Sequence, residues 1–105
     1  MHTHILLTGG SRGIGAAIAA ALDRPDVRVV ALSSKDGDLN DPAVPARLWD
    51  DALAQLNGRV DVLINNAGEF AANPIDINDA AWLAGWERGV RINLTAAADL
   101  SRRFV

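Results

Sequence analysis

The sequence predicts an α/β domain in which helices cover both faces of a doubly wound parallel sheet, giving three α/β/α layers. Short apolar runs alternate with helical patterns along the chain, and such alternation favours a parallel sheet with right-handed crossovers. The first apolar run ends in a glycine-rich turn that begins at Gly9. With 105 residues, half of them hydrophobic, the chain can build one packed core and no second domain.

The first three predicted elements form a β-α-β unit. Residues 5–8 are an apolar run stopped by two glycines, which is typical of a strand buried on both faces. Residues 13–22 are small and apolar and place Ile14 and Ile18 on one helical face, so they predict a helix. Residues 27–32 are rich in β-branched side chains and predict a second strand parallel to the first.

Three more elements are predicted after this unit. Asp41 is a suitable N-cap and Pro42 suits a first turn, so a helix is expected from there to Gly58. Residues 60–64 predict a third strand, and a final helix capped by Asp79 continues to the end of the chain. The first strand should lie between the other two, which leaves an apolar edge that further strands are expected to cover.

The composition excludes several classes of function. Thirteen acidic and ten basic residues are intermixed along the chain, so there is no basic patch for a nucleic acid. Cysteine is absent, and His2 and His4 are expected to be solvated near the terminus, so no metal site is predicted. No signal pattern is present and no apolar run approaches the about 20 residues that span a bilayer, so we expect no membrane contact and a cytoplasmic location.

The glycine-rich turn is the strongest functional signal in the chain. Glycines at 9, 13 and 15 stand where a strand must turn sharply, admit a phosphate to the backbone and pack a helix against the sheet. The helix that follows points free N–H groups at the turn, which predicts a pyrophosphate site. A P-loop would need Lys and Ser or Thr after the last glycine, and Ala16-Ala17 stand there instead. The residues of this turn that are expected to bind the ligand carrying the pyrophosphate are Thr8, Gly9, Ser11, Arg12, Gly13, Ile14 and Gly15.

Two linked motifs resemble the short-chain dehydrogenase/reductase family, in its compact reductase branch. They are Thr8-Gly9-x-x-x-Gly13-x-Gly15, and Gly58-x-x-Asp61 leading into Asn65-Asn66-Ala67-Gly68. The resemblance implies a Rossmann-like fold in which residues 1–105 are an incomplete dinucleotide-binding domain, the N-terminal half of such a protein. It also implies hydride transfer between a nicotinamide cofactor and a carbonyl or alcohol substrate, and a homo-oligomer.

The same resemblance implies roles for residues after the glycine turn. Asp38 would accept a hydrogen bond from the adenine amine, with Leu39 beside the ring, although a solvated acid in an Asp-rich turn is the alternative. Near the third strand, the residues expected to line the ribose and the sheet end are Asn65, Ala67 and Gly68. Asn66 could either tie neighbouring strands together or touch the ligand. Asn93 matches the active-site Asn that holds a water in the family's proton relay.

The end of the second strand predicts the choice between NADP and NAD. An acid at this place would pair with the ribose 2′-hydroxyl of NAD and repel the phosphate of NADP, but the position holds Ser33. Ser34, Lys35 and Arg12 supply a hydroxyl and two cations for a 2′-phosphate, so NADP is favoured. NAD stays possible because Asp36 could turn toward the ribose.

Two departures from the family pattern bear on function. The family places a helix and a strand before its adenine Asp, whereas only Asp36 and Gly37 separate Lys35 from Asp38. The family's catalytic Tyr, Lys and Ser belong to a second half that this chain does not contain, and the chain has no tyrosine. These 105 residues are therefore expected to be inactive alone, and a non-catalytic dinucleotide-binding or scaffolding module is the alternative function.

Overall fold

A parallel three-stranded sheet forms the centre of the molecule. The structure, a computed structural model, describes residues 2–105. The strands are β1 (Thr3–Thr8), β2 (Val27–Leu32) and β3 (Val62–Ile64), arranged in the order β2-β1-β3. Both neighbours run parallel to β1, with Leu6 opposite Val30 on one side and Leu63 on the other. The predicted parallel sheet with the first strand at its centre is confirmed.

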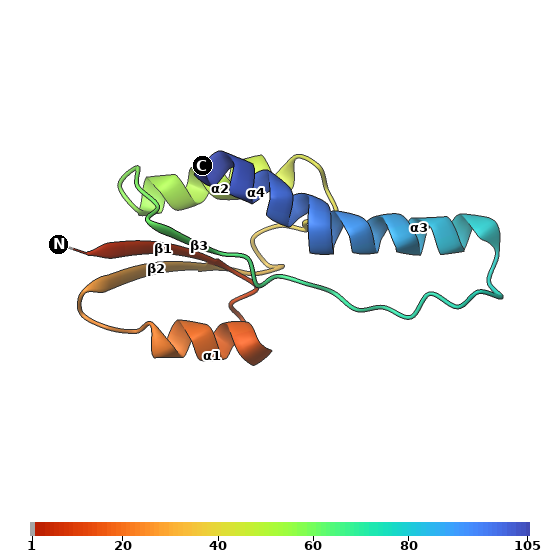
Figure 1. The fold of residues 1–105 in the computed structure, drawn as a ribbon, viewed down its shortest axis with the longest axis horizontal. Coiled ribbons are helices and arrows are strands. Elements are labelled where there is room, and N and C mark those ends of the chain that lie inside the picture. The colour runs from red at the N-terminus through yellow and green to blue at the C-terminus, as the bar shows by residue number, and fades with distance from the viewer. Residues whose placement is uncertain (1) are drawn as a thin grey trace.

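Helices cover both faces of this sheet, as predicted. Helix α1 (Gly13–Ala21) lies on one face, and α2 (Val44–Gln55) and α4 (Ala96–Phe104) lie side by side on the other (Figure 1). Trp49 in α2 and Phe104 in α4 form a T-shaped aromatic pair, with 6.5 Å between the ring centroids. The three-layer α/β/α arrangement follows from these contacts.

The core lies between the sheet and α2. Alternate strand residues face this helix, and residues three or four apart on the helix face back, so the two periodicities match. The fully or nearly buried members are Leu6, Val30, Leu32, Val44, Leu48, Ala52 and Leu56. The layer under α1 is thinner: Ile5 and Leu7 are buried, but Ile14, expected on the inner face of the helix, is 76% exposed. Helix α1 therefore rests on the sheet mainly through its small residues.

Three predicted starts are wrong. Strand β1 begins at Thr3 instead of residue 5, and α2 and β3 begin later than predicted for local reasons. Helix α2 begins at Val44, because Asp41 forms a separate turn before it. The Asp41 side chain accepts the N–H of Ala43 at 2.9 Å, and the Asp41 carbonyl accepts the N–H of Val44 at 3.1 Å. Strand β3 begins at Val62, because the carboxylate of Asp61 takes the backbone N–H of His4 at 2.8 Å. A side chain thus replaces one rung of the β1–β3 ladder.

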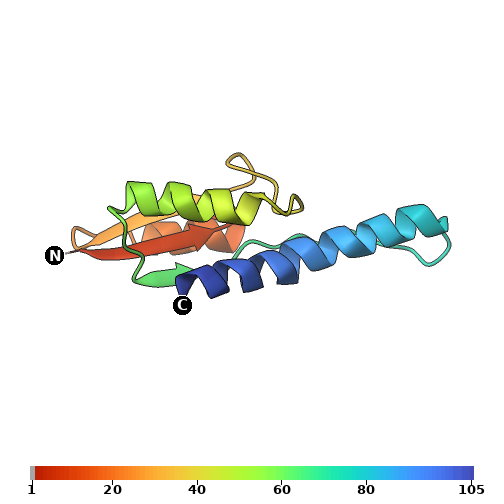
Figure 2. The same cartoon turned by 90° about the horizontal axis from the view of Figure 1, so that it is seen from above.

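The predicted final helix is a long rod made of three parts. Helix α3 (Asp79–Val90) continues through a π-helical turn, η1 (Arg91–Thr95), into α4, and Figure 2 shows the rod reaching beyond the sheet. Asn78, and not the expected Asp79, caps it by accepting the N–H of Ala81 at 2.9 Å. The π turn was not predicted.

Helix α3 projects away from the sheet. None of its residues is buried by residues 2–105, and Trp82 and Trp86 stack in parallel with 5.7 Å between ring centroids while Trp86 stays 56% exposed. The radius of gyration is 15.2 Å, above the about 13 Å of a compact domain of this size. The projection accounts for this elongation, and it leaves an apolar helix face uncovered.

His4 is buried, so the expectation that it is solvated is wrong. It is only 6% exposed, and its Nδ1 donates to the carbonyl of Arg59 at 3.0 Å. The guanidinium of Arg59 in turn binds the Asp61 carboxylate at 3.0 Å and the His2 carbonyl at 2.6 Å.

Residues 2–105 hold no cluster of three metal-ligating side chains. None of the described helices is long and apolar enough to cross a bilayer.

Asp61 makes the stability of this fold depend on pH. The backbone N–H of His4, and then the guanidinium of Arg59, hold the pKa of the Asp61 carboxyl below its ordinary value of 3.8. A lowered pKa in the folded state stabilises the fold above the unfolded pKa, and this contribution is lost as the pH falls through the folded pKa. We expect Asp61→Asn to unfold at lower urea than the wild type at about pH 7, with the gap closing toward about pH 2.

The exposed Asp23, which has no side-chain bond among the described residues, supplies the matched control. At each pH in this range, Asp23→Asn should unfold at the same urea concentration as the wild type. If the urea midpoints of the wild type and Asp61→Asn differ by the same amount at about pH 7 and about pH 2, the lowered pKa of Asp61 does not stabilise the fold.

Candidate functional site

A cleft of about 560 Å³ opens at the carboxyl ends of the three strands. Ligands of open parallel sheets bind in this place, outside the carboxyl ends and beside the strand where the winding reverses. The glycine turn, the loop after β2, the segment after β3 and the rod of α3 and η1 form its walls. The residues that line it are Thr8, Gly9, Ser11, Arg12, Gly13, Ile14, Gly15, Leu32, Ser33, Ser34, Gly37, Asp38, Leu39, Leu48, Asn66, Ala67, Gly68, Glu69, Arg88 and Ile92.

The glycine turn is held by a joint between the ends of β1 and β3. Thr8 is buried, and its hydroxyl oxygen accepts the backbone N–H groups of Asn66 at 3.2 Å and Ala67 at 3.0 Å. The side-chain amide of Asn66 donates to the carbonyl of Gly9 at 2.9 Å. Asn66 therefore ties the strands together, the structural one of its two expected roles, although it also lines the cleft.

Gly15 brings α1 into contact with this turn. A Cβ at Gly15 would overlap the carbonyl oxygen of Gly9 and lie 2.5 Å from the side-chain nitrogen of Asn66, so no other residue fits. Gly9 has a φ of +69°, which turns the chain sharply after β1. No side chain caps the N-terminus of α1. Its first N–H groups are thus available to an anion in the cleft.

The first part of the loop after β2, residues 33–36, contributes two serines to the cleft and no charged residue. Ser33 and Ser34 line the cleft, whereas Lys35 and Asp36 do not. The carboxylate of Asp36 accepts the backbone N–H of Ser33 at 2.8 Å, and the hydroxyl of Ser33 accepts that of Lys35 at 3.3 Å. The cations that line the cleft are instead Arg12, in the glycine turn, and Arg88, in α3.

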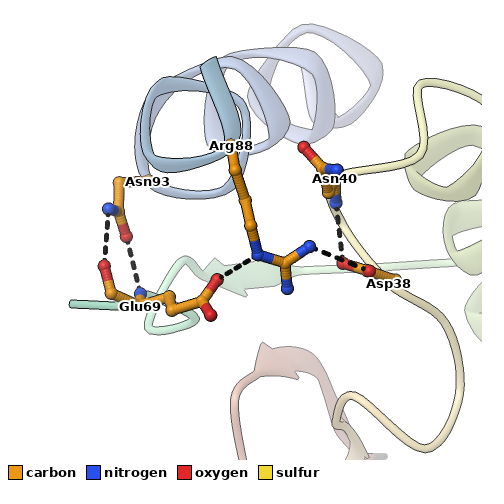
Figure 3. A network of polar contacts seen from close by, with 5 residues as sticks. All are labelled: Asp38, Asn40, Glu69, Arg88 and Asn93. Atoms are coloured by element: carbon orange, nitrogen blue, oxygen red, sulfur yellow. Dashed lines mark hydrogen bonds and ion pairs between the residues drawn. The ribbon is translucent and has the colours of Figure 1, made fainter. Parts of the chain in front are cut away.

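Arg88 joins two acidic side chains across the cleft wall (Figure 3). Its Nη1 lies 3.1 Å from the carboxylate of Asp38, and its Nε lies 2.9 Å from that of Glu69. The backbone N–H of Asn40 donates to the other oxygen of Asp38 at 3.0 Å. This N–H, and then Arg88, lower the pKa of Asp38, while Asp38 raises the pKa of Arg88.

Asn93 and Asn65 lie outside the lining of this cleft. In η1, the side chain of Asn93 accepts the N–H of Glu69 and donates to its carbonyl, both at 2.8 Å (Figure 3). Asn93 also borders an adjoining hollow of about 540 Å³. The side chain of Asn65 points to α4, where it donates to the hydroxyl of Ser101 at 3.1 Å. Of the expected site residues, the structure therefore leaves Lys35, Asn65 and Asn93 out of the cleft lining.

The rod contributes two residues that the sequence analysis missed. Arg88 and Ile92 line the cleft from α3 and η1. They are four residues apart, so they share one face of a helix. Their position in the helix that carries Asn93, which the family resemblance placed at the active site, was the signal that could have found them.

Gly15→Ala tests the close packing of the turn. The added methyl group would force α1 away from the turn, and overpacking of this kind typically costs about 1 to 3 kcal/mol. Gly58→Ala is the control, because nothing lies within 4 Å of a Cβ built at Gly58. Gly58 has a φ of +82°, so this variant should lose only the about 1 kcal/mol of stability that a left-handed conformation costs a residue with a Cβ. Urea unfolding should show the larger loss for Gly15→Ala, and an equal or smaller loss would contradict the packing argument.

Known proteins resemble this chain in sequence and in fold. No model of a protein family matches the chain. A rhamnolipid-biosynthesis 3-oxoacyl-[acyl-carrier-protein] reductase from Pseudomonas aeruginosa is 32% identical, over 87% of this chain and 42% of the relative. The short chain dehydrogenase ausX from Emericella nidulans is 30% identical, over 96% of this chain and 58% of the relative.

Solved structures agree with these relatives. An oxidoreductase of the short chain dehydrogenase/reductase type from Brucella ovis superimposes with a TM-score of 0.76 and 28% identity, over 98% of this chain and 54% of the other. The chain spans about half the length of the relatives it matches. Since sequence relatives and superimposable folds point to one group of proteins, the chain belongs to the short-chain dehydrogenase/reductase family.

Proposed function

We propose that the cleft binds NADP(H) and that the chain is the cofactor-binding part of an oxidoreductase that transfers hydride between NADP(H) and a carbonyl or alcohol substrate. The observation that carries this proposal is the packing at Gly15, which leaves no room for a Cβ and sets the uncapped N-terminus of α1 against the cleft. A diphosphate fits such a place because it meets free N–H groups and the positive end of the helix dipole.

Each part of the cleft has a proposed partner on the cofactor. The diphosphate would lie against Ser11 and the backbone of Gly13, Ile14 and Gly15, with Thr8 and Gly9 shaping the turn. The adenine would lie between Asp38 and Leu39, and Ala67 and Gly68 would border the ribose at the end of β3. Asn65, which faces α4, would support this sheet end from behind.

The preference for NADP rests on the charges around the loop after β2. Arg12, Ser33 and Ser34 line the cleft there, and no carboxylate of this loop before Asp38 does. Asp36, which could have turned toward the ribose of NAD, is held by the N–H of Ser33. A phosphate on the ribose would therefore meet a guanidinium and two hydroxyls. Lys35 would add only long-range attraction from outside the cleft.

The bound nicotinamide would supply or accept the hydride, and the chain would hold the surrounding groups. We keep Asn93 as the proposed water-holding residue of a proton relay. Its two bonds to the Glu69 backbone fix its amide in place, and each polar atom retains capacity for one further bond, which a water could use.

These 105 residues contain no tyrosine, which is the family's proton donor. General acids contribute about a hundredfold or more to rate, so we propose that the chain binds cofactor without appreciable turnover. The same absence favours the second candidate, a non-catalytic dinucleotide-binding or scaffolding module. Mixing the chain with NADPH and a panel of ketones tests the proposed lack of turnover, because measurable oxidation of NADPH would contradict it.

The proposed preference for NADP can be measured by titrating the chain with NADPH and NADH, following tryptophan quenching and cofactor fluorescence. We expect NADPH to bind about tenfold more tightly, which corresponds to about 1.4 kcal/mol. Arg12→Met should remove most of this preference by weakening NADPH alone, because a charge-assisted contact to the 2′-phosphate is lost.

Two variants control this titration. Arg24→Met removes the same charge just before the amino end of β2, where Arg24 pairs with Asp26, and should keep the preference. Gly13→Asp places a carboxylate at a φ of +57° inside the phosphate turn, and should abolish binding of both cofactors. Tighter binding of NADH than NADPH would overturn the NADP assignment, and no binding by a folded chain would overturn the proposed function.

The homo-oligomer implied by the family is also a proposal, which the uncovered face of α3 supports. Trp82, Leu83, Trp86 and Val90 are exposed on this helix, and contiguous apolar surface of this kind commonly marks an interface. We expect sedimentation equilibrium to show a dimer that Trp86→Lys converts to a monomer, while Lys substituted at the isolated, exposed Ile14 of α1 leaves the dimer intact. A monomeric wild type would contradict the proposal.

A further inference from the structure

Arg88 connects two segments that are far apart in the sequence. It pairs with Asp38, fifty residues earlier, and with Glu69, nineteen residues earlier, and all three side chains line the cleft (Figure 3). The side chains of Arg88 and Glu69 are each 39% exposed, and that of Asp38 is 57% exposed. Ion pairs this exposed add little to stability, typically about 0 to 1 kcal/mol. Their position in the cleft suggests that they serve the ligand more than the fold.

The carboxylate of Asp38 is held at both oxygens by donors from different elements. The N–H of Asn40 binds Oδ1 from within the same loop, and Arg88 binds Oδ2 from α3. Two donors on two oxygens set the plane of the carboxyl group, and each oxygen still has a free lone pair for another donor. The loop itself lacks the strand that would otherwise support it, because residues 33–43 run from β2 to α2 without joining the sheet. Arg88 is therefore the donor that holds Asp38 from outside this loop.

We infer that Arg88 is a positioning residue that orients Asp38 toward the exocyclic amine of the adenine, so that recognition of the base depends on Arg88. This inference rests on the proposed function. Because a carboxylate accepts hydrogen bonds and donates none, an oriented Asp38 favours a base that carries an amine and disfavours one that carries a carbonyl oxygen at the same place.

A direct role of Arg88 in binding phosphate fits the geometry less well. Its guanidinium already binds two carboxylates at 3.1 and 2.9 Å, and two negative charges against one positive charge leave the group with a net negative charge. A phosphate would gain little attraction from such a group. The effect of Arg88 should therefore appear in the choice of base more than in the overall affinity for anions.

The test compares NADPH with its hypoxanthine analogue, which has the same charge but carries a carbonyl oxygen in place of the adenine amine. We expect the wild-type chain to prefer NADPH by about tenfold. Arg88→Met should reduce this preference to about twofold or less, because Asp38 is no longer oriented. In an Asp38→Asn background, Arg88→Met should have no further effect on the preference, as expected for two residues that act through one contact.

Arg91→Met is the matched control, since it removes the same charge three residues along the rod and Arg91 does not line the cleft. It should keep the full preference, and circular dichroism should show that every variant is folded. Equal weakening of both cofactors by Arg88→Met, or a preference that it leaves unchanged, would overturn the inference, as would a wild type without preference. If the folded wild type binds neither cofactor, the proposed function fails together with this inference.

Discussion

The joint between the ends of β1 and β3 is the constraint on which the site depends. A single buried hydroxyl, that of Thr8, accepts two backbone N–H groups from the neighbouring strand end, and the amide of Asn66 binds the carbonyl of Gly9 in return. These bonds fix the turn that Gly15 packs against, and the start of α1 takes its position from that turn. Because β3 has only three residues, these side-chain hydrogen bonds replace the backbone hydrogen bonds that a longer strand would form with β1.

The parts of this site that could be predicted were those encoded by neighbouring residues. The glycine spacing, the apolar strand before it and the small residues of α1 depend on local backbone geometry, so they could be read directly. The strand order followed from alternation of strands and helices. Asn66 could be narrowed to two roles because an amide at a strand end either bonds its neighbour or a ligand.

The parts that could not be predicted depend on contacts between distant residues or on competition between equivalent ones. Asn78 and Asp79 are both good caps, and only the three-dimensional path of the chain decides between them. His4 reads as a terminal residue until Arg59 and Asp61 cover it. Arg88 meets Asp38 across fifty residues, and no local pattern encodes that pair. A five-residue π turn is too short to change the hydrophobic period.

The π turn also determines which side chains the rod directs toward the cleft and which it directs toward the core. Each residue of an α-helix advances the side-chain direction by about 100°, so the extra residue in a wide turn changes the angular phase of everything after it. Before η1 the rod presents Arg88 to the cleft, and after it the rod buries Leu100 beside α2. The π turn thus sets the rotation of α3 relative to α4 about the rod axis. Inserting or deleting one residue in the turn would rotate the cleft-facing side of α3 relative to the core-facing side of α4, although the side chains of both helices would stay the same.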